Sequence, residues 1–380
     1  MHASRSHVAR LALILMLVWT LAACTAKPAE AGPKIASSGF VCPEPSPRME
    51  VTSKEINIFT WTEYVPSDII ECFGLVYDIQ VNVEYFSSNE ELNAKMVASG
   101  DANAYDVIHP SDYIIDVLAR EDILQPIDQG RISNWKNLNS DLLVAYGDSL
   151  NYVVPYQMGT QAIVYNSETV TNPPTSWADL WSAEYEGRIV AVDDTRVIIG
   201  VSLLSLGYSI NETDPARLEE AKQKLIELMP NIRVFDSDSP KTALIAGDVD
   251  LGMTWTGEAE LAARENPAFI YVYPTEGTIR WMDNYVIPKE AAHLDAAYAW
   301  LNYSMQGSIF WKMMIDFPYT MPSQGALDFA KTNQAELYEA YINSPITNTP
   351  AENLTKSFYF EDVGEATPLY DKIWTEIKGE

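Results

Sequence analysis

The stretch INIFTWTEYVPSDIIECF, residues 56–73, indicates the fold class. Residues 56–59 form a short apolar run that is typical of a buried strand. The Pro-Ser-Asp sequence at 66–68 then begins a helix, which carries on one face Ile69, Ile70 and Phe73. The same order is repeated, with strands expected at 81–86 and 105–109 and helices at 89–98 and from Ser111. This βαβαβ order predicts a mostly parallel sheet with helices on both faces.

A second α/β unit is expected to begin near residue 152. Strand-like segments occur at 153–155, 162–165, 189–192, 249–255 and 271–273. A helical turn is expected at 176–181. Asp214 is followed by Pro215, the arrangement of an N-cap and a proline at the first helical position. The helix that follows places at helical spacing Leu218, Ala221, Leu225 and Leu228. The chain is therefore expected to fold into two α/β domains.

Composition restricts the class of partner. The 380 residues are enough for two domains, each with its own core. Acidic residues number 53 and basic residues 25, for a formal net charge of -28. Nucleic acid and anionic membrane surfaces would be repelled by this charge, so neither is an expected partner.

The N-terminus has the pattern of a secretory signal. Arg5 and Arg10 precede the apolar run 11–19, which is short for a membrane span. Leu-Ala-Ala-Cys, ending at Cys24, resembles the lipobox of bacterial lipoproteins. We therefore predict a signal peptide over 1–23, lipidation at Cys24 and a flexible tether over 24–53. The protein would then lie on the outer face of the cytoplasmic membrane, bound only by its lipid anchor. An ordinary signal peptide with an incidental cysteine is the alternative.

The sequence does not decide whether the two remaining cysteines are joined by a disulfide. Cys42 and Cys72 could form a disulfide in an oxidising compartment, or remain two free thiols. Neither a CxxC sequence nor a His–Cys spacing is present, so we expect no metal site.

An enzyme is not the favoured interpretation. The sequence has no G-x-S-x-G, H-E-x-x-H or Walker A motif. Of four histidines, two lie in the signal, and His109 and His293 lie in apolar surroundings typical of structural histidines. A secreted glycosidase with two carboxylates remains an alternative. We predict no catalytic residue and no cofactor.

Aromatic and acidic residues gather where strands are expected to end. In open α/β sheets, ligands bind beyond the carboxyl ends of the strands. The residues in such positions are Trp61, Tyr64, Tyr113, Asp194, Trp255, Trp281 and Asp283. Singly, each aromatic ring is better explained as a core-edge residue. Together they predict a box for a small organic cation.

These segments resemble the spermidine/putrescine-binding proteins of polyamine ABC transporters, from about residue 56 to the C-terminus. The resemblance rests on five pieces in the same order, which are WTEYVP (61–66), AYDV (104–107) with PS (110–111), TSWADLW (175–181), LGMTWTG (251–257) and WMD (281–283). It implies a two-lobed, type II periplasmic-binding-protein-like α/β fold with the ligand in the interlobe cleft. We expect the first lobe at 54–153 and 282–322, the second at 154–281, and C-terminal helices at 323–380 packed mainly on the second lobe.

The resemblance also implies the ligand-binding residues. These are Trp61, Thr62, Tyr64, Ser111, Tyr113, Asp194, Ser237, Trp255, Trp281, Asp283 and Phe317, the last at a position usually held by Tyr. Two positions depart from the family pattern, because Val197 replaces a usual Glu and Phe360 replaces a usual Gln. Acids that could compensate are Glu258, Asp193 and Asp112. The departures leave the ligand open, and a shorter or singly charged amine is an alternative.

We therefore predict a monomeric extracellular binding lipoprotein that captures a polyamine and delivers it to a membrane-embedded ABC permease. A protein of the same fold that binds a sugar or another small solute is the second interpretation. The glycosidase is the third.

Overall fold

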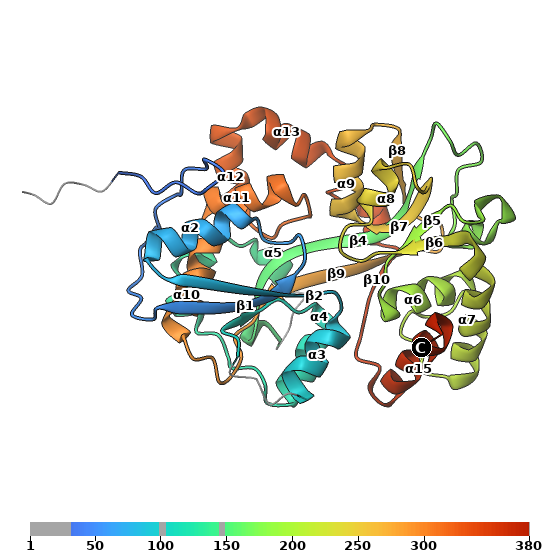
Figure 1. The fold of residues 1–380 in the computed structure, drawn as a ribbon, viewed down its shortest axis with the longest axis horizontal. Helices are drawn as coiled ribbons and strands as arrows, with labels where there is room; N and C mark the ends of the chain where they lie inside the picture. Colours follow the sequence, from blue (N-terminus) through green and yellow to red (C-terminus); the bar gives the residue numbers. More distant parts are fainter. Residues whose placement is uncertain (1–31, 99–103, 144–148, 380) are drawn as a thin grey trace, which may run out of the picture. The chain divides into compact units, whose positions relative to one another are not determined.

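The computed structural model describes residues 32–98, 104–143 and 149–379. From Ile35 onward, the described residues form one compact unit, in which two α/β lobes share two long strands (Figure 1). The predicted signal peptide and Cys24 lie outside the described residues. Within the described ranges, every helix is too short or too polar to serve as a membrane span.

The first lobe contains a parallel sheet of strand order β2-β1-β3. Strand β1 pairs with β2 from Glu55↔Gln80 to Trp61↔Phe86, and with β3 at Ile58↔Val107. Helices cover both faces, as the βαβαβ order predicted. The elements are β1 (Glu55–Trp61), α2 (Ser67–Tyr77), β2 (Gln80–Phe86), α3 (Asn89–Ala98), β3 (Val107–Ile108), α4 (Asp112–Arg120), η1 (Gln129–Arg131), η2 (Ser133–Asn137), α5 (Ser140–Leu143), α10 (Leu294–Ser304) and α11 (Gly307–Asp316).

The second lobe is built on a mixed sheet of order β10-β9-β4-β7-β5-β6, with β8 paired to β4. Strand β5 is parallel to β6 and β7, whereas β4 is antiparallel to β7, β8 and β9. The elements are η4 (Trp177–Trp181), η5 (Ala183–Tyr185), β5 (Ile189–Ala191), α6 (Thr195–Ser205), α7 (Pro215–Leu228), η6 (Met229–Asn231), β6 (Ile232–Phe235), α8 (Lys241–Ile245), β7 (Leu251–Trp255), α9 (Thr256–Glu265), β8 (Phe269–Val272), α14 (Ala351–Leu354), β10 (Ser357–Tyr359), η7 (Gly364–Ala366) and α15 (Thr367–Lys378).

Two long antiparallel strands connect the lobes. Strand β4 (Val154–Asn166) pairs with β9 (Thr278–Tyr285), with an irregularity between Pro155 and Gln157. The sequence predicted two separate strands at 153–155 and 162–165, which the structure joins into one. The start of β4 packs into the first-lobe core and its end into the second-lobe core. The predicted site residues Trp281 and Asp283, on β9, therefore lie where the chain passes between the lobes.

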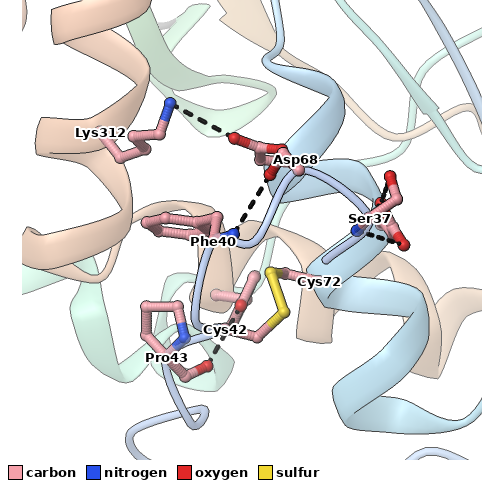
Figure 2. The surroundings of a disulfide bond; sticks show 10 residues. Ser37, Phe40, Cys42, Pro43, Asp68, Cys72 and Lys312 are labelled. Atoms are coloured by element: carbon pink, nitrogen blue, oxygen red, sulfur yellow. Dashed lines mark hydrogen bonds and ion pairs between the residues drawn. A yellow bond between two sulfur atoms is a disulfide. The ribbon is translucent and has the colours of Figure 1, made fainter. Parts of the chain in front are cut away.

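The segment predicted as a tether is folded where the structure describes it. Cys42 is joined to Cys72 of α2, which decides between the disulfide and two free thiols (Figure 2). The backbone N–H of Ser46 donates to Gln306 Oε1 at 2.9 Å, and that of Thr52 to Asp295 Oδ2 at 2.6 Å. A flexible tether over 35–53 is thus wrong, because these contacts fix the chain to the first lobe.

The C-terminal region divides between the lobes. Helices α12 (Gln324–Asn333) and α13 (Ala335–Asn343) bury Ala326, Ala330 and Tyr341 in the first-lobe core. Helix α15 instead buries Tyr370 and Ile373 in the second-lobe core. The prediction that the whole of 323–380 packs mainly on the second lobe is therefore wrong for α12 and α13.

Candidate functional site

A cavity that is open to solvent lies between the lobes. The structure brings all but one of the predicted site residues to its wall. Those present are Trp61, Thr62, Tyr64, Ser111, Tyr113, Asp194, Ser237, Trp255, Trp281 and Asp283. Sequence reasoning did not assign to the site four other lining residues, namely Glu63, Asn89, Asp238 and Tyr319. Val197 and Phe360, the two residues that depart from the family pattern, also line the cavity.

Asp283 is fixed at the crossing strands. It lies on β9 in a bridge with Ser111, whose Oγ donates to Asp283 Oδ1 at 2.6 Å. Tyr64 OH donates to Asp283 Oδ2, also at 2.6 Å. The carboxyl is only 5% exposed, and burial raises its pKa to about 7, while the two hydrogen bonds oppose that rise. A cation next to this group would favour its ionised form.

Asp194 lines the cavity from the second lobe, where it begins a helix. It is the N-cap of α6, and its Oδ1 accepts a hydrogen bond from the backbone N–H of Val197 at 2.9 Å. The side chain is 6% exposed, and burial raises its pKa, an effect that this hydrogen bond and Arg196 oppose. Asp194 also raises the pKa of Asp283, since two carboxylates in one cavity repel each other.

Aromatic rings form the walls between the two carboxylates. The Trp255 and Trp281 rings are almost perpendicular, with centroids 6.1 Å apart, and Tyr319 lies 5.1 Å from Trp281. The indole N–H of Trp61 donates to the carbonyl of His109 at 2.8 Å, and that of Trp255 to the carbonyl of Ser237 at 3.2 Å. These bonds fix the orientation of the two indole rings at the cavity wall.

Two glycines make room for the rings. A Cβ added to Gly159 of β4 would lie 2.6 Å from the Trp281 ring. A Cβ added to Gly257, in the first turn of α9, would lie 2.5 Å from the Tyr319 ring. Both separations are below van der Waals contact, so the ring positions depend on glycine at these sites.

Phe317 is the one predicted site residue that the structure places elsewhere. It packs against the first-lobe core, and Tyr319 lines the cavity in its place. The backbone N–H of Tyr319 donates to the carbonyl of Phe317 at 2.8 Å, so the chain turns tightly around Pro318. The match by sequence position was therefore two residues early. No local pattern marked Tyr319, because the space that its ring fills is left by Gly257, which is distant in the sequence.

None of the three acids considered as compensation lines the cavity. Glu258 is 3% exposed and forms an ion pair with Lys241 at 3.0 Å. Asp193 forms an ion pair with Lys378 at 2.9 Å. Asp112 Oδ1 accepts from the backbone N–H of Tyr113 at 2.9 Å. The expectation that one of them replaces the missing carboxylate is not supported by their positions.

Asn89 and two acids complete the wall. Asn89 is buried, donates through Nδ2 to Ser111 Oγ at 2.9 Å and accepts from the Ser111 N–H at 3.0 Å. At the mouth, Glu63 forms an ion pair with Lys241 at 2.6 Å, and Asp238 accepts from Ser87 Oγ at 3.1 Å. Asn89 begins helix α3, and its sequence position alone suggested only a helix start. Across the described ranges, no three His, Cys, Asp or Glu side chains converge as metal ligands would.

Comparison with known proteins assigns the family. The family model of bacterial extracellular solute-binding proteins matches residues 69–340. The chain belongs to this family. A spermidine/putrescine-binding periplasmic protein of Salmonella typhimurium is 34% identical over 322 residues, which cover 84% of this chain and 90% of the relative. A putrescine/agmatine-binding protein of Pseudomonas aeruginosa is 26% identical over 345 residues, which cover 85% of this chain and 91% of the relative.

Solved structures agree with this assignment. A putative spermidine/putrescine ABC transporter protein from Listeria monocytogenes superposes with a TM-score of 0.80 at 28% identity, covering 86% of this chain and 99% of that one. A substrate-binding protein of a spermidine/putrescine ABC transporter from Streptococcus pneumoniae gives a TM-score of 0.68 at 31% identity, with the same coverage. The predicted two-lobed, periplasmic-binding-protein-like α/β fold is confirmed.

Proposed function

We propose that this protein captures a polyamine, a small organic polycation, in the interlobe cavity and delivers it to an ABC importer. The observation that carries the proposal is the pair of buried carboxylates, Asp194 and Asp283, within walls of aromatic rings. The named ligands of the relatives, spermidine and putrescine or putrescine and agmatine, are cations of this kind.

The interactions are sufficient for micromolar binding. Burying the four methylenes of putrescine contributes ~0.8 kcal/mol each, or ~3 kcal/mol in total. A charge-assisted hydrogen bond at each ammonium adds ~1.5–3 kcal/mol. The sum of about 6–9 kcal/mol compares with ~8 kcal/mol for a micromolar dissociation constant, before the ordering of the ligand is included.

Isothermal titration calorimetry tests the proposal. We expect the protein without residues 1–23 to bind putrescine, agmatine or spermidine, and Asp283→Asn to weaken the best ligand about 50-fold, because a carboxylate–ammonium pair is lost. Asp193→Asn, which changes an acid outside the cavity, should bind like wild type. Absence of binding for all three amines would refute the proposal. Sugar binding that is insensitive to Asp283→Asn would favour a neutral solute.

The remaining parts of the proposal concern the setting of the site. Secretion through a signal at 1–23 and lipidation at Cys24 would place a monomer on the outer face of the cytoplasmic membrane, where it meets the permease. We place the first lobe at 54–153 and 282–322 and the second at 154–281. The return near residue 281 is supported by the packing of Ile279 in the second-lobe core and of Tyr285 in the first-lobe core, whereas Val154 and Tyr156 still pack in the first-lobe core. No catalysis is proposed for the two carboxylates. Membrane fractionation of Cys24→Ser tests the anchor, since this variant should be released in soluble form.

A further inference from the structure

The cavity wall beside Asp194 is apolar. Val197 and Phe360 line it and are 1% and 7% exposed. Val197 lies in the first turn of α6, three residues after the Asp194 carboxylate that its N–H contacts. The Phe360 ring packs edge-on to Tyr113, with centroids 5.7 Å apart. A ligand atom at this wall therefore meets alkyl and phenyl groups.

A resident cation lies behind that wall. Arg196 is 4% exposed, and its guanidinium is 4.8 Å from the centroid of the Phe360 ring and 5.4 Å from that of Tyr113. It donates to the Glu361 carbonyl at 3.1 Å and to Asn211 Oδ1 at 3.0 Å. Arg196 favours the ionised form of Asp194 and so opposes the rise in its pKa that burial causes. The guanidinium therefore already compensates part of the negative charge of this carboxylate. A ligand charge at this wall, in addition to the one that Asp194 can pair with, would be opposed by the buried Arg196 guanidinium.

Other acids near the cavity have resident partners. Lys241 contacts both Glu63 and Glu258, and Asp238 accepts from Ser87 at the mouth. Glu90 does not line the cavity. Its Oε1 accepts a hydrogen bond from the Tyr113 hydroxyl at 3.1 Å, its buried Oε2 has no hydrogen-bond partner among the described residues, and burial together with Asp194 raises its pKa to about 7, which favours its neutral form. Among the described residues that line the cavity, Asp194 and Asp283 are the acids that are both buried and free of an ion pair with lysine.

We propose that the cavity accepts a linear diammonium ion and discriminates against triamines of the spermidine class, with Val197 and Phe360 as the specificity-determining residues. This inference rests on the proposed function. One ammonium is placed at Asp283, the other at Asp194, and the alkyl chain between the aromatic rings. A third charged centre would lose its water against the apolar wall without gaining a carboxylate, which is strongly unfavourable.

Calorimetry with putrescine and spermidine at one pH and ionic strength tests the discrimination. We expect wild type to bind spermidine at least about tenfold more weakly than putrescine, as one unpaired ammonium requires. Val197→Glu adds a carboxylate at the N-terminus of α6, where negative charge is favourable. It should improve spermidine binding at least about tenfold relative to putrescine. Val197→Gln, of matched length without charge, should leave the ratio unchanged.

The outcomes separate the two proposals. If folded wild-type protein binds none of the amines, the proposed function itself fails. If it binds spermidine as tightly as putrescine, the function stands and the discrimination is refuted, whatever the variants do. If Val197→Glu and Val197→Gln change the ratio equally, charge at this position does not control selectivity, and the assigned role of Val197 is wrong.

Discussion

The two ends of the cavity hold a carboxylate by different means. At one end, Asp283 accepts hydrogen bonds from the neutral hydroxyls of Ser111 and Tyr64, and no lysine or arginine of the described residues forms an ion pair with it. At the other end, Asp194 caps a helix and shares the field of Arg196. A carboxylate that a helix N-terminus and an arginine already stabilise gains less from a ligand cation than a carboxylate that only neutral hydroxyls contact. We therefore expect the Asp283 end to dominate affinity and the Asp194 end to contribute more to selectivity.

The largest effect is expected from the ring cluster beside Asp283. Gly257→Ala would bring a methyl group within 2.5 Å of the Tyr319 ring, which packs against Trp281 and Tyr64. Overpacking of this kind costs ~1–3 kcal/mol, and we expect diamine affinity to fall by about 10- to 100-fold. Calorimetry and thermal unfolding measure both changes.

The matched control is Gly200→Ala at the other end. Its added Cβ would lie 3.5 Å from both Phe360 and Ile279, which is ordinary contact, and the position is inside helix α6. Replacing a helical glycine with alanine stabilises by roughly 0.5–1 kcal/mol. We expect unchanged diamine affinity and slightly higher stability. Equal loss of affinity in both glycine variants would show that the ring cluster has no special role.

The same rings show what the sequence could and could not predict. Expected strand ends predicted Asp194, which follows the parallel strand β5, because parallel strands finish at one edge of a sheet. Trp281 and Asp283 were assigned to the site by the same argument, but they lie inside β9, which is antiparallel to β4, so the argument from strand ends is wrong for them. Helix α7 was likewise predicted with its four core residues, since a local apolar period of 3.6 specifies it. Tyr319 was missed because its ring packs directly against Gly257, which is more than sixty residues away in the sequence. Such a contact has no local signal.

Other misses share that long-range cause. The N-terminal segment 35–53 has a composition typical of a linker, yet the disulfide to Cys72 and the bonds to Gln306 and Asp295 fix it. Lys241 could not be paired with Glu258 and Glu63 from spacing alone. The packing of α8 on α9 brings Lys241 to Glu258, and the approach of the first lobe brings it to Glu63. Composition predicts which segments can bury themselves, whereas the partners of charged side chains depend on the tertiary fold.

The second expected effect is a pH dependence that belongs to the Asp283 end. Burial raises the pKa of Asp283 to about 7, from an ordinary value near 3.8. Between these values the folded protein binds more protons than the unfolded chain, so the free energy of unfolding falls as pH rises. Amine binding needs the ionised carboxylate, so affinity should rise about tenfold from pH 6 to pH 8. Calorimetry from pH 6 to pH 8 measures the change in affinity. Urea unfolding at pH values between the two pKa values measures the change in the free energy of unfolding.

Asp283→Asn is the control for this dependence. Burial also raises the pKa of Glu90 and Glu258 to about 7, so these two acids give unfolding a slope of the same sign. Only the part that Asp283→Asn removes belongs to the cavity carboxylate. If ligand affinity keeps the same pH dependence in this variant, the titrating group lies elsewhere.

The smallest effect is expected at Asp194, where charge and helix capping can be separated. Asn is as good an N-cap as Asp, so Asp194→Asn should leave unfolding unchanged, whereas Asp194→Ala should cost about 1 kcal/mol. Because Arg196 already shares the field of this carboxylate, the Asn variant should weaken putrescine binding by only about three- to fivefold, against about 50-fold for Asp283→Asn. Calorimetry on the two Asn variants makes the comparison directly. If both Asn variants lose the same putrescine affinity, Arg196 does not weaken the interaction of Asp194 with a ligand cation. The proposed difference between Asp194 and Asp283 would then be refuted.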